Sequence, residues 1–82
     1  MQLEMFPDRL HLRRIDPTSR MRRFYEMAVQ RDLLGGAVLI CEWGRIGSPG
    51  KIQRELHRDE GQAMDRLIAR ARAKARRGYR QP

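Results

Sequence analysis

A tryptophan, an arginine and four residues that shape the backbone stand together in residues 42–50, directly after an apolar run. Three glycines there permit positive φ or close approach to a partner, and Pro49 fixes φ and removes a hydrogen-bond donor. Trp43 offers a flat ring for stacking, and Arg45 offers a planar fork that pairs bidentately with phosphate. We therefore predict a ligand-contact loop for an anionic partner with rings or sugars, of which nucleic acid fits best. The ordinary alternative is a tryptophan that packs at the rim of the core.

A second basic cluster precedes two aromatic residues earlier in the chain. Arg20, Arg22 and Arg23 stand just before Phe24 and Tyr25. Guanidinium groups beside aromatic rings suit a nucleic-acid backbone, because phosphates pair with the cations while bases stack on the rings. The alternative is an exposed basic turn followed by aromatic residues of the core.

Lys74 is the most informative cation near the end of the chain, because it falls inside the apolar arc of the helix that we predict over residues 62–77. Snorkelling of its aliphatic stem is the ordinary explanation, and a contact to a ligand is the other. Arg70 and Arg77 flank the same arc. Lys51 follows the loop and either contacts phosphate or protects an edge strand from pairing.

No arrangement typical of catalysis or of metal binding is visible in the sequence. His11, His57 and Cys41 show no ligand spacing and no nucleophile signature, so we assign each a structural role. The glycines of the loop do not match a dinucleotide-binding fingerprint, and no paired carboxylates or Ser-His-Asp set stands out. We predict a protein that is not an enzyme and that uses no cofactor and no metal.

Arginine dominates the charge of the chain. Lys and Arg total 18 against 10 acidic residues, which gives a net charge of +8, and 16 of the 18 basic residues are Arg. Residues 62–82 carry +6 of this charge, since they hold seven basic residues and one acidic residue. Such a field attracts polyanions and speeds their encounter, although a run of charge is also typical of a solvated helix face.

Length and hydropathy predict one small domain, residues 1–82 with a core at about 9–79. The single cysteine, Cys41, forms no internal disulfide and favours a reducing compartment. Residues 1–9 lack the long apolar run of a signal peptide, and no segment approaches the roughly 20 apolar residues that span a membrane. We expect a soluble cytoplasmic protein with no membrane partner, and nucleoid association is an alternative.

Hydrophobic alternation predicts the strands. Residues 10–14, 22–30 and 51–56 alternate apolar and polar side chains, which is typical of half-buried strands, and the last is polar enough for an edge. Residues 37–43 are almost continuously apolar, which favours a central strand buried on both sides. The core face of the second strand is expected to hold Tyr25, Met27 and Val29.

A helix is predicted to close the chain. Asp59 is the expected N-cap, with Gln62 three residues later as in a capping box, and Gly78 is the expected C-cap. One apolar stripe of this helix must pack on the sheet. Together these elements predict an α+β fold, a small antiparallel sheet of about four strands packed against one long C-terminal helix. The stripe consists of Ala63, Met64, Leu67, Ile68, Ala71 and Ala75.

Short motifs stand in order along the chain: Arg-Phe-Tyr at 23–25, Leu-Leu-Gly at 33–35, Trp-Gly-Arg-Ile-Gly at 43–47, Lys74, and Gly-Tyr at 78–79. In this order and spacing they resemble the WGR domain, a family named after its Trp-Gly-Arg motif. The resemblance extends from about residue 14 to residue 79. The chain is similar to a stand-alone WGR protein of bacterial type and to the WGR domain of the DNA-dependent poly(ADP-ribose) polymerases.

The resemblance implies a non-enzymatic module that binds duplex DNA and prefers its ends. It implies that Trp43 packs against the terminal sugar or base and that Arg45 contacts phosphate or supports the loop. Arg22 and Arg23 stand where the polymerases commonly hold Asn-Lys, so phosphate affinity should persist while contacts that need the Asn amide are lost. The expected DNA-binding residues are Trp43, Arg45, Arg22, Arg23, Lys51, Lys74, Arg70 and Tyr79.

Two other partners fit the same residues. In a protein-interaction or regulatory adaptor, the loop would dock an acidic protein, with Trp43 as the interface anchor. RNA is a third interpretation, because it offers the same phosphates and flat rings.

Overall fold

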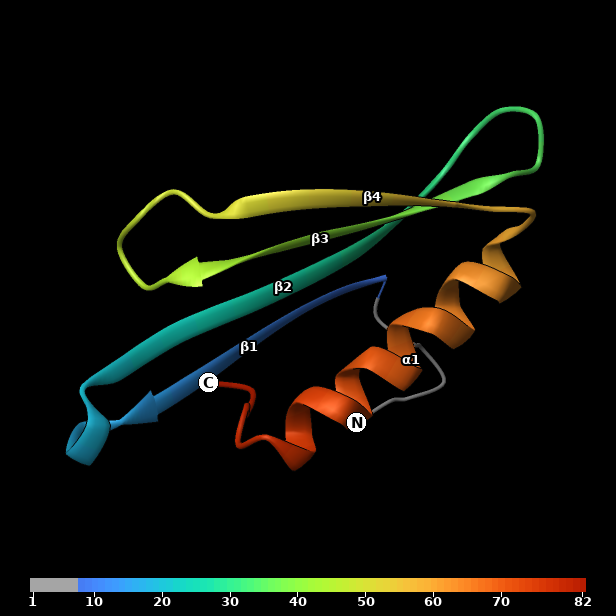
Figure 1. The fold of residues 1–82 in the computed structure, drawn as a ribbon. Coiled ribbons are helices and arrows are strands. Elements are labelled where there is room, and N and C mark those ends of the chain that lie inside the picture. Colours follow the sequence, from blue (N-terminus) through green and yellow to red (C-terminus); the bar gives the residue numbers. More distant parts are fainter. Residues whose placement is uncertain (1–7) are drawn as a thin grey trace.

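A four-stranded antiparallel sheet with one helix on it forms the protein, in a computed structural model that describes residues 8–82. The strands lie side by side in chain order, and α1 crosses one face of the sheet, over β2, β3 and β4 (Figure 1). The predicted α+β fold is confirmed. The elements are β1 (Arg9–Asp16), the 3₁₀ turn η1 (Pro17–Ser19), β2 (Met21–Arg31), β3 (Ala37–Arg45), β4 (Lys51–His57) and α1 (Glu60–Arg76).

Alternation along β2 sets the core, as predicted. Tyr25, Met27 and Val29 are buried, and the antiparallel register places Cys41 opposite Met27 and Leu39 opposite Val29 on the helix-covered face. Residues of one strand alternate between faces, so a whole apolar set points at the helix at once. The buried residues are Leu12, Tyr25, Met27, Val29, Ala37, Leu39, Cys41, Ala63, Leu67 and Tyr79.

The helix begins at the predicted cap. The Asp59 carboxylate accepts a hydrogen bond from the Gln62 backbone N–H at 2.8 Å. The Gln62 side chain accepts in turn from the backbone N–H of Arg58 at 3.0 Å, one residue earlier than in the capping box. The cap therefore fixes both the start of α1 and the chain that leads into it from β4.

Gly78 ends the helix with φ of 96°, a left-handed conformation that favours glycine. The backbone N–H of Gly78 donates to Ala75 O and that of Tyr79 donates to Lys74 O, both at 3.1 Å, which is a Schellman arrangement. The chain then turns back so that Arg80 exchanges two backbone hydrogen bonds of 2.8 Å with Arg13. This bridge covers part of the outer edge of β1 and holds the end of α1 against the sheet.

Two predictions about burial are wrong. We expected residues 37–43 to be buried on both sides, but Val38, Ile40 and Glu42 lie half-buried on a face that no element of residues 8–82 covers. The described part of the chain supplies one α-helix for two faces of the sheet, and this helix covers the apolar run of β3 on one side only. We also placed Ala75 in the apolar stripe of α1, but it is exposed, and Lys74 takes the inward position.

Within the described residues, α1 is neither long enough nor apolar enough to cross a membrane.

Candidate nucleic-acid interface

A row of three arginines crosses the sheet where β1 and β3 end and β2 begins. Arg23 lies directly opposite Arg14 on one side and Arg45 on the other, and by strand alternation all three belong to the helix-covered face. We call Arg14, Arg23 and Arg45 the arginine row. Directly opposite side chains have Cβ atoms about 4.5–5.5 Å apart, and like charges at that spacing destabilise a sheet. Among residues 8–82 none of the three forms an ion pair with a carboxylate, so the row is open to an external anion.

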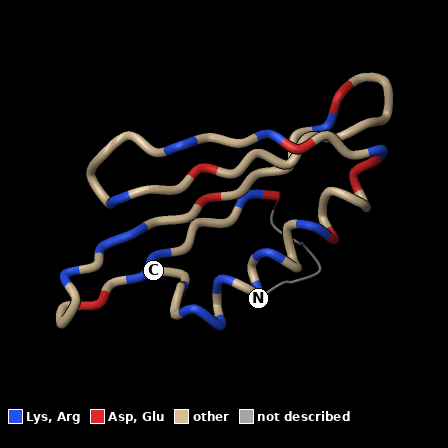
Figure 2. Tube along the Cα trace, viewed as in Figure 1, with Lys and Arg blue, Asp and Glu red and all other residues tan. Residues whose placement is uncertain are grey.

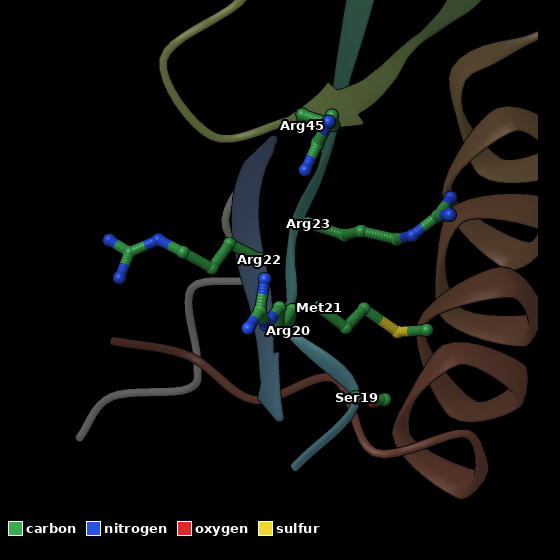
Figure 3. A pocket seen from close by; sticks show the side chains of 6 residues that line it. All are labelled: Ser19, Arg20, Met21, Arg22, Arg23 and Arg45. Atoms are coloured by element: carbon green, nitrogen blue, oxygen red, sulfur yellow. The ribbon is translucent and has the colours of Figure 1, made fainter. Parts of the chain in front are cut away.

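A hollow of about 340 Å³ joins this row to the turn before β2. Arg22 and Arg23 project to opposite sides of β2, and Arg23 points toward the helix (Figure 3). Arg20 has φ of 54°, a conformation that is sparsely populated for residues with a Cβ and that tends to occur at functional sites. We call this hollow the arginine pocket; it is lined by Ser19, Arg20, Met21, Arg22, Arg23 and Arg45.

Trp43 belongs to β3 and not to the loop, which corrects the prediction of a contact loop over residues 42–50. Strand pairing continues through Trp43 to Arg45, and only residues 46–50 turn. The indole stacks on Tyr25, with ring centroids 5.9 Å apart and planes 20° apart, and packs partly against the core. Because Trp43 and Arg45 are two residues apart on one strand, they share the face that carries the arginine row.

Close backbone approach explains why the turn is rich in glycine. A Cβ on Gly50 would lie 2.7 Å from the Trp43 carbonyl oxygen and 2.8 Å from Cζ of Phe24. The Ile46 backbone N–H donates to Arg22 O at 3.0 Å, which ties the turn to the first residues of β2. The turn therefore holds the end of β3, and with it Trp43 and Arg45, in a fixed position.

Lys74 lies between two aromatic rings next to Trp43. Its Nζ is 4.3 Å from the ring centroid of Tyr25 and 5.3 Å from that of Tyr79, within the range of cation–π attraction. Burial, and then the charges of Arg77 and Arg70, lower the pKa of Lys74 from its ordinary 10.5. The two rings favour the ammonium form, whereas burial opposes it. We call the rings of Tyr25 and Tyr79 the aromatic cage of Lys74. Tyr79, which we predicted as a DNA contact, is a core residue.

Replacement of Lys74 by Met tests whether this lysine binds a ligand or only snorkels. We expect stability to change by less than about 1 kcal/mol, because the desolvation cost and the cation–π attraction oppose each other. If the ammonium contacts phosphate, duplex affinity falls and the log–log salt slope shrinks by about 1. Thermal denaturation and fluorescence anisotropy measure the two effects, and unchanged affinity would assign Lys74 to snorkelling alone.

Arg70, which we predicted as a DNA contact, is hydrogen-bonded to other residues of the protein. Its guanidinium donates to Glu55 at 2.7 Å and to the Tyr25 hydroxyl at 3.2 Å, while its buried Nε has no partner among the described residues. The hydrogen bond from His57, followed by the charges of Arg70 and Arg66, holds the pKa of Glu55 below its ordinary 4.5 against the effect of burial. Arg70 therefore positions Tyr25, and through it Trp43, with its charge already compensated.

The lowered pKa of Glu55 predicts acid sensitivity. A carboxyl whose pKa is lower in the folded state stabilises the protein above its unfolded pKa, near 4.5, and loses that effect as pH falls through the folded pKa. We expect wild type to be more stable than Glu55→Gln at pH 7, with a difference that shrinks below pH 4.5. Melting temperatures of both proteins from pH 7 to pH 3 measure it. A difference that is constant with pH would show that the Glu55 charge contributes nothing.

Charge is distributed unevenly over the molecule. Lys and Arg gather at the end of the sheet that carries the arginine row and along the second half of α1 (Figure 2). Asp16, an acidic residue at this end, accepts hydrogen bonds from the Thr18 hydroxyl at 2.7 Å and from the Thr18 backbone N–H at 3.1 Å. Lys51 is exposed directly opposite Trp43, and so extends the positive surface across to β4. We call this end, with Arg20, Arg22, Arg23, Arg45 and Lys51, the cationic end. Its positive field attracts a polyanion.

The structure brings together most of the predicted site residues, from four elements. Trp43, Arg45 and Lys51 meet at the ends of β3 and β4, and Arg22 and Arg23 join them from β2. Lys74 reaches the same place from α1, next to Tyr25. The prediction missed Arg14, although its spacing of two from Leu12 put it on the inward face of β1. It placed Arg20 in the basic cluster before Phe24 but did not predict its left-handed backbone. Within residues 8–82, no three His, Cys, Asp or Glu side chains are arranged to hold a metal ion.

The protein is a small α+β domain whose sheet carries arginines and a partly exposed tryptophan at one end, which are features of a binding module. The chain belongs to the WGR domain family, whose model matches residues 8–82. It is 36% identical over 74 residues to a protein of Sinorhizobium fredii described as the uncharacterized protein y4dW, a match that covers 90% of this chain and 36% of the relative. The chain thus spans about a third of that relative's length. No solved structure matches the chain. A WGR domain taken alone is a binding module, and the family is consistent with nucleic-acid binding.

Proposed function

We propose that the protein binds duplex DNA, preferably at its ends, without catalysing a reaction. The observation that carries the proposal is the arginine row: three arginines at directly opposite positions of neighbouring strands, without an acidic partner among the described residues. Such a row costs stability in the free protein, and an anion that bridges the groups removes that cost. Adjacent phosphates of a nucleic-acid backbone supply bridging anions at a regular spacing.

The neighbouring aromatic residues support a preference for ends. Trp43 is stacked on Tyr25 by one face and lies only partly buried beside the row, so the rest of the indole is open to a sugar or base. Inside a continuous duplex those groups are covered by stacking and pairing, whereas at an end the last pair exposes them. End preference also agrees with the resemblance to the DNA-dependent polymerases. The residues proposed to contact DNA are Trp43, Arg45, Arg22, Arg23, Arg14, Lys51 and Lys74.

Fluorescence anisotropy with four probes tests the proposal: a 5′-phosphorylated blunt duplex, the same duplex without phosphate, a closed dumbbell and single-stranded RNA. We expect the blunt duplexes to bind more tightly than the dumbbell. If four to six phosphates are engaged, the log–log salt slope lies between about −4 and −5. Equal binding to all four probes would leave a general polyanion surface, and no binding near physiological salt would favour an adaptor for an acidic protein.

A further inference from the structure

The face of the sheet opposite α1 carries a second hollow, of about 260 Å³, that the arginine row does not use. It lies at the same end of the sheet as the cationic end, on strand positions that point away from the helix. Aromatic, carboxylate and imidazole groups meet there. The lining residues are His11, Arg13, Phe24, Glu26, Glu42, Ile46 and Gly47.

Phe24 gives this hollow a fixed flat wall. The turn backbone lies against the ring, since a Cβ on Gly50 would be 2.8 Å from Cζ and one on Gly44 would be 3.5 Å from Cε1. The His11 ring is nearly parallel to it, at 11°, with ring centroids 6.4 Å apart. Two parallel rings on an open sheet form a stacking surface for an unpaired base, since every base has a π face.

The carboxylates decide which part of a nucleotide the hollow accepts. Glu42 lies directly opposite Glu26 on this face. The Glu26 carboxylate is hydrogen-bonded to Nδ1 of His11 at 3.3 Å. Half-buried Glu42 makes no hydrogen bond or ion pair with another of the described residues. Two adjacent carboxylates repel a phosphate but accept hydrogen bonds from the amino groups of bases, as when Glu accepts from cytosine N4.

The two hollows are connected through β2 and the turn after β3. Arg22 lines the arginine pocket and lies two residues before Phe24 on the same face, about 6.6 Å along the strand. Arg45 lines the first hollow, and the next residue, Ile46, lines the second. The arginines that could bind a phosphate and the Phe24 and Glu42 side chains that could bind a base are thus separated by about the length of one nucleotide.

We propose that this face holds an unpaired, amino-bearing base at the end of a DNA strand whose phosphate occupies the arginine pocket, an assignment that rests on the proposed binding of DNA ends. Phe24 and His11 stack on the base, and Glu42 accepts a hydrogen bond from its amino group. The site then distinguishes an end with an overhang from a blunt end, and cytosine from thymine, which lacks an exocyclic amino group.

Anisotropy titrations of one duplex with different ends test this site. The probes are a blunt end and two-nucleotide overhangs of dC or of dT, each in 5′ and 3′ form. We expect the dC overhang to bind about ten times more tightly than the blunt end, in at least one polarity, and the dT overhang to fall between them. Glu42→Gln should remove the preference for dC over dT, and Phe24→Leu should remove the advantage of both overhangs.

Asp65→Asn is the control, because it removes one negative charge from an exposed helix position outside the hollow. If Glu42 acted only through its charge, Glu42→Gln and Asp65→Asn would both raise affinity for every probe, and that result overturns the proposal. Equal binding of overhangs and blunt end by wild type also overturns it, while leaving the function at duplex ends intact; absence of any duplex binding removes both. Sedimentation of the protein without DNA gives its oligomeric state. If wild type were a dimer and Phe24→Leu a monomer, this face would bind a second copy of the chain, and the proposal would be overturned.

Discussion

Replacement of Arg23 and Arg45 together by Gln should weaken duplex binding about 100-fold and shrink the log–log salt slope by about 2. Each guanidinium is expected to make one charge-assisted contact to phosphate, worth about 1.5 kcal/mol and one unit of slope. The same variant should be more stable than wild type by up to about 1 kcal/mol, because it removes like charges that face each other across the strands. Anisotropy at two salt concentrations and thermal denaturation without DNA measure the two effects.

Opposite changes in affinity and stability distinguish a ligand site from a structural cluster. If the two arginines stabilised the sheet, stability and affinity would fall together. Arg58→Gln is the matched control, since it removes one exposed guanidinium next to the N-cap of α1, beyond the other end of β4. We expect that variant to bind nearly as tightly as wild type. The control removes one charge and the double variant removes two, so a control loss of about half the double-variant loss, on a logarithmic scale, would show that total charge alone determines binding.

Alternation along each strand was enough to predict which residues face the helix, but not which residues lie beside one another. Tyr25, Met27 and Val29 are buried as predicted, because a period of two depends on a single strand. The arginine row depends on the register of two hairpins, and thus on the lengths of two turns that alternation does not fix. Arg14 was therefore missed, although its face was predictable.

Local motifs predicted the ends of the helix better than its surroundings. Asp59 and Gly78 cap α1 as expected, because a cap depends on a few neighbouring residues. The partners of Arg70 and Lys74 were not predictable, since Glu55 and Tyr25 come from strands far away in sequence. Position on a helical wheel identified Lys74 as unusual, and only the tertiary structure supplies the aromatic cage that explains it.

Replacement of Trp43 by Ala should destabilise the fold by about 2–3 kcal/mol and weaken binding to duplex ends. The stability loss is smaller than for a fully buried tryptophan, because Trp43 is only partly covered, yet it removes the stack on Tyr25. If the open part of the indole stacks on a terminal base or sugar, the free energy of binding to duplex ends is also weakened, by about 1–3 kcal/mol. Trp43→Phe keeps a ring on Tyr25, so we expect it to recover most of the stability and only part of the affinity.

Loss of folded protein mimics loss of affinity, so the Trp43 result needs a variant that destabilises without touching the cationic end. Met64→Ala serves, because Met64 is a partly buried residue near the start of α1 that packs against the same core. Measured at a temperature where both variants are folded, Met64→Ala should bind duplex ends like wild type. Matching affinities for Trp43→Ala and Met64→Ala would show that Trp43 only packs against the core. A preference for ends would then have to come from the arginine pocket and from the hollow on the face opposite α1.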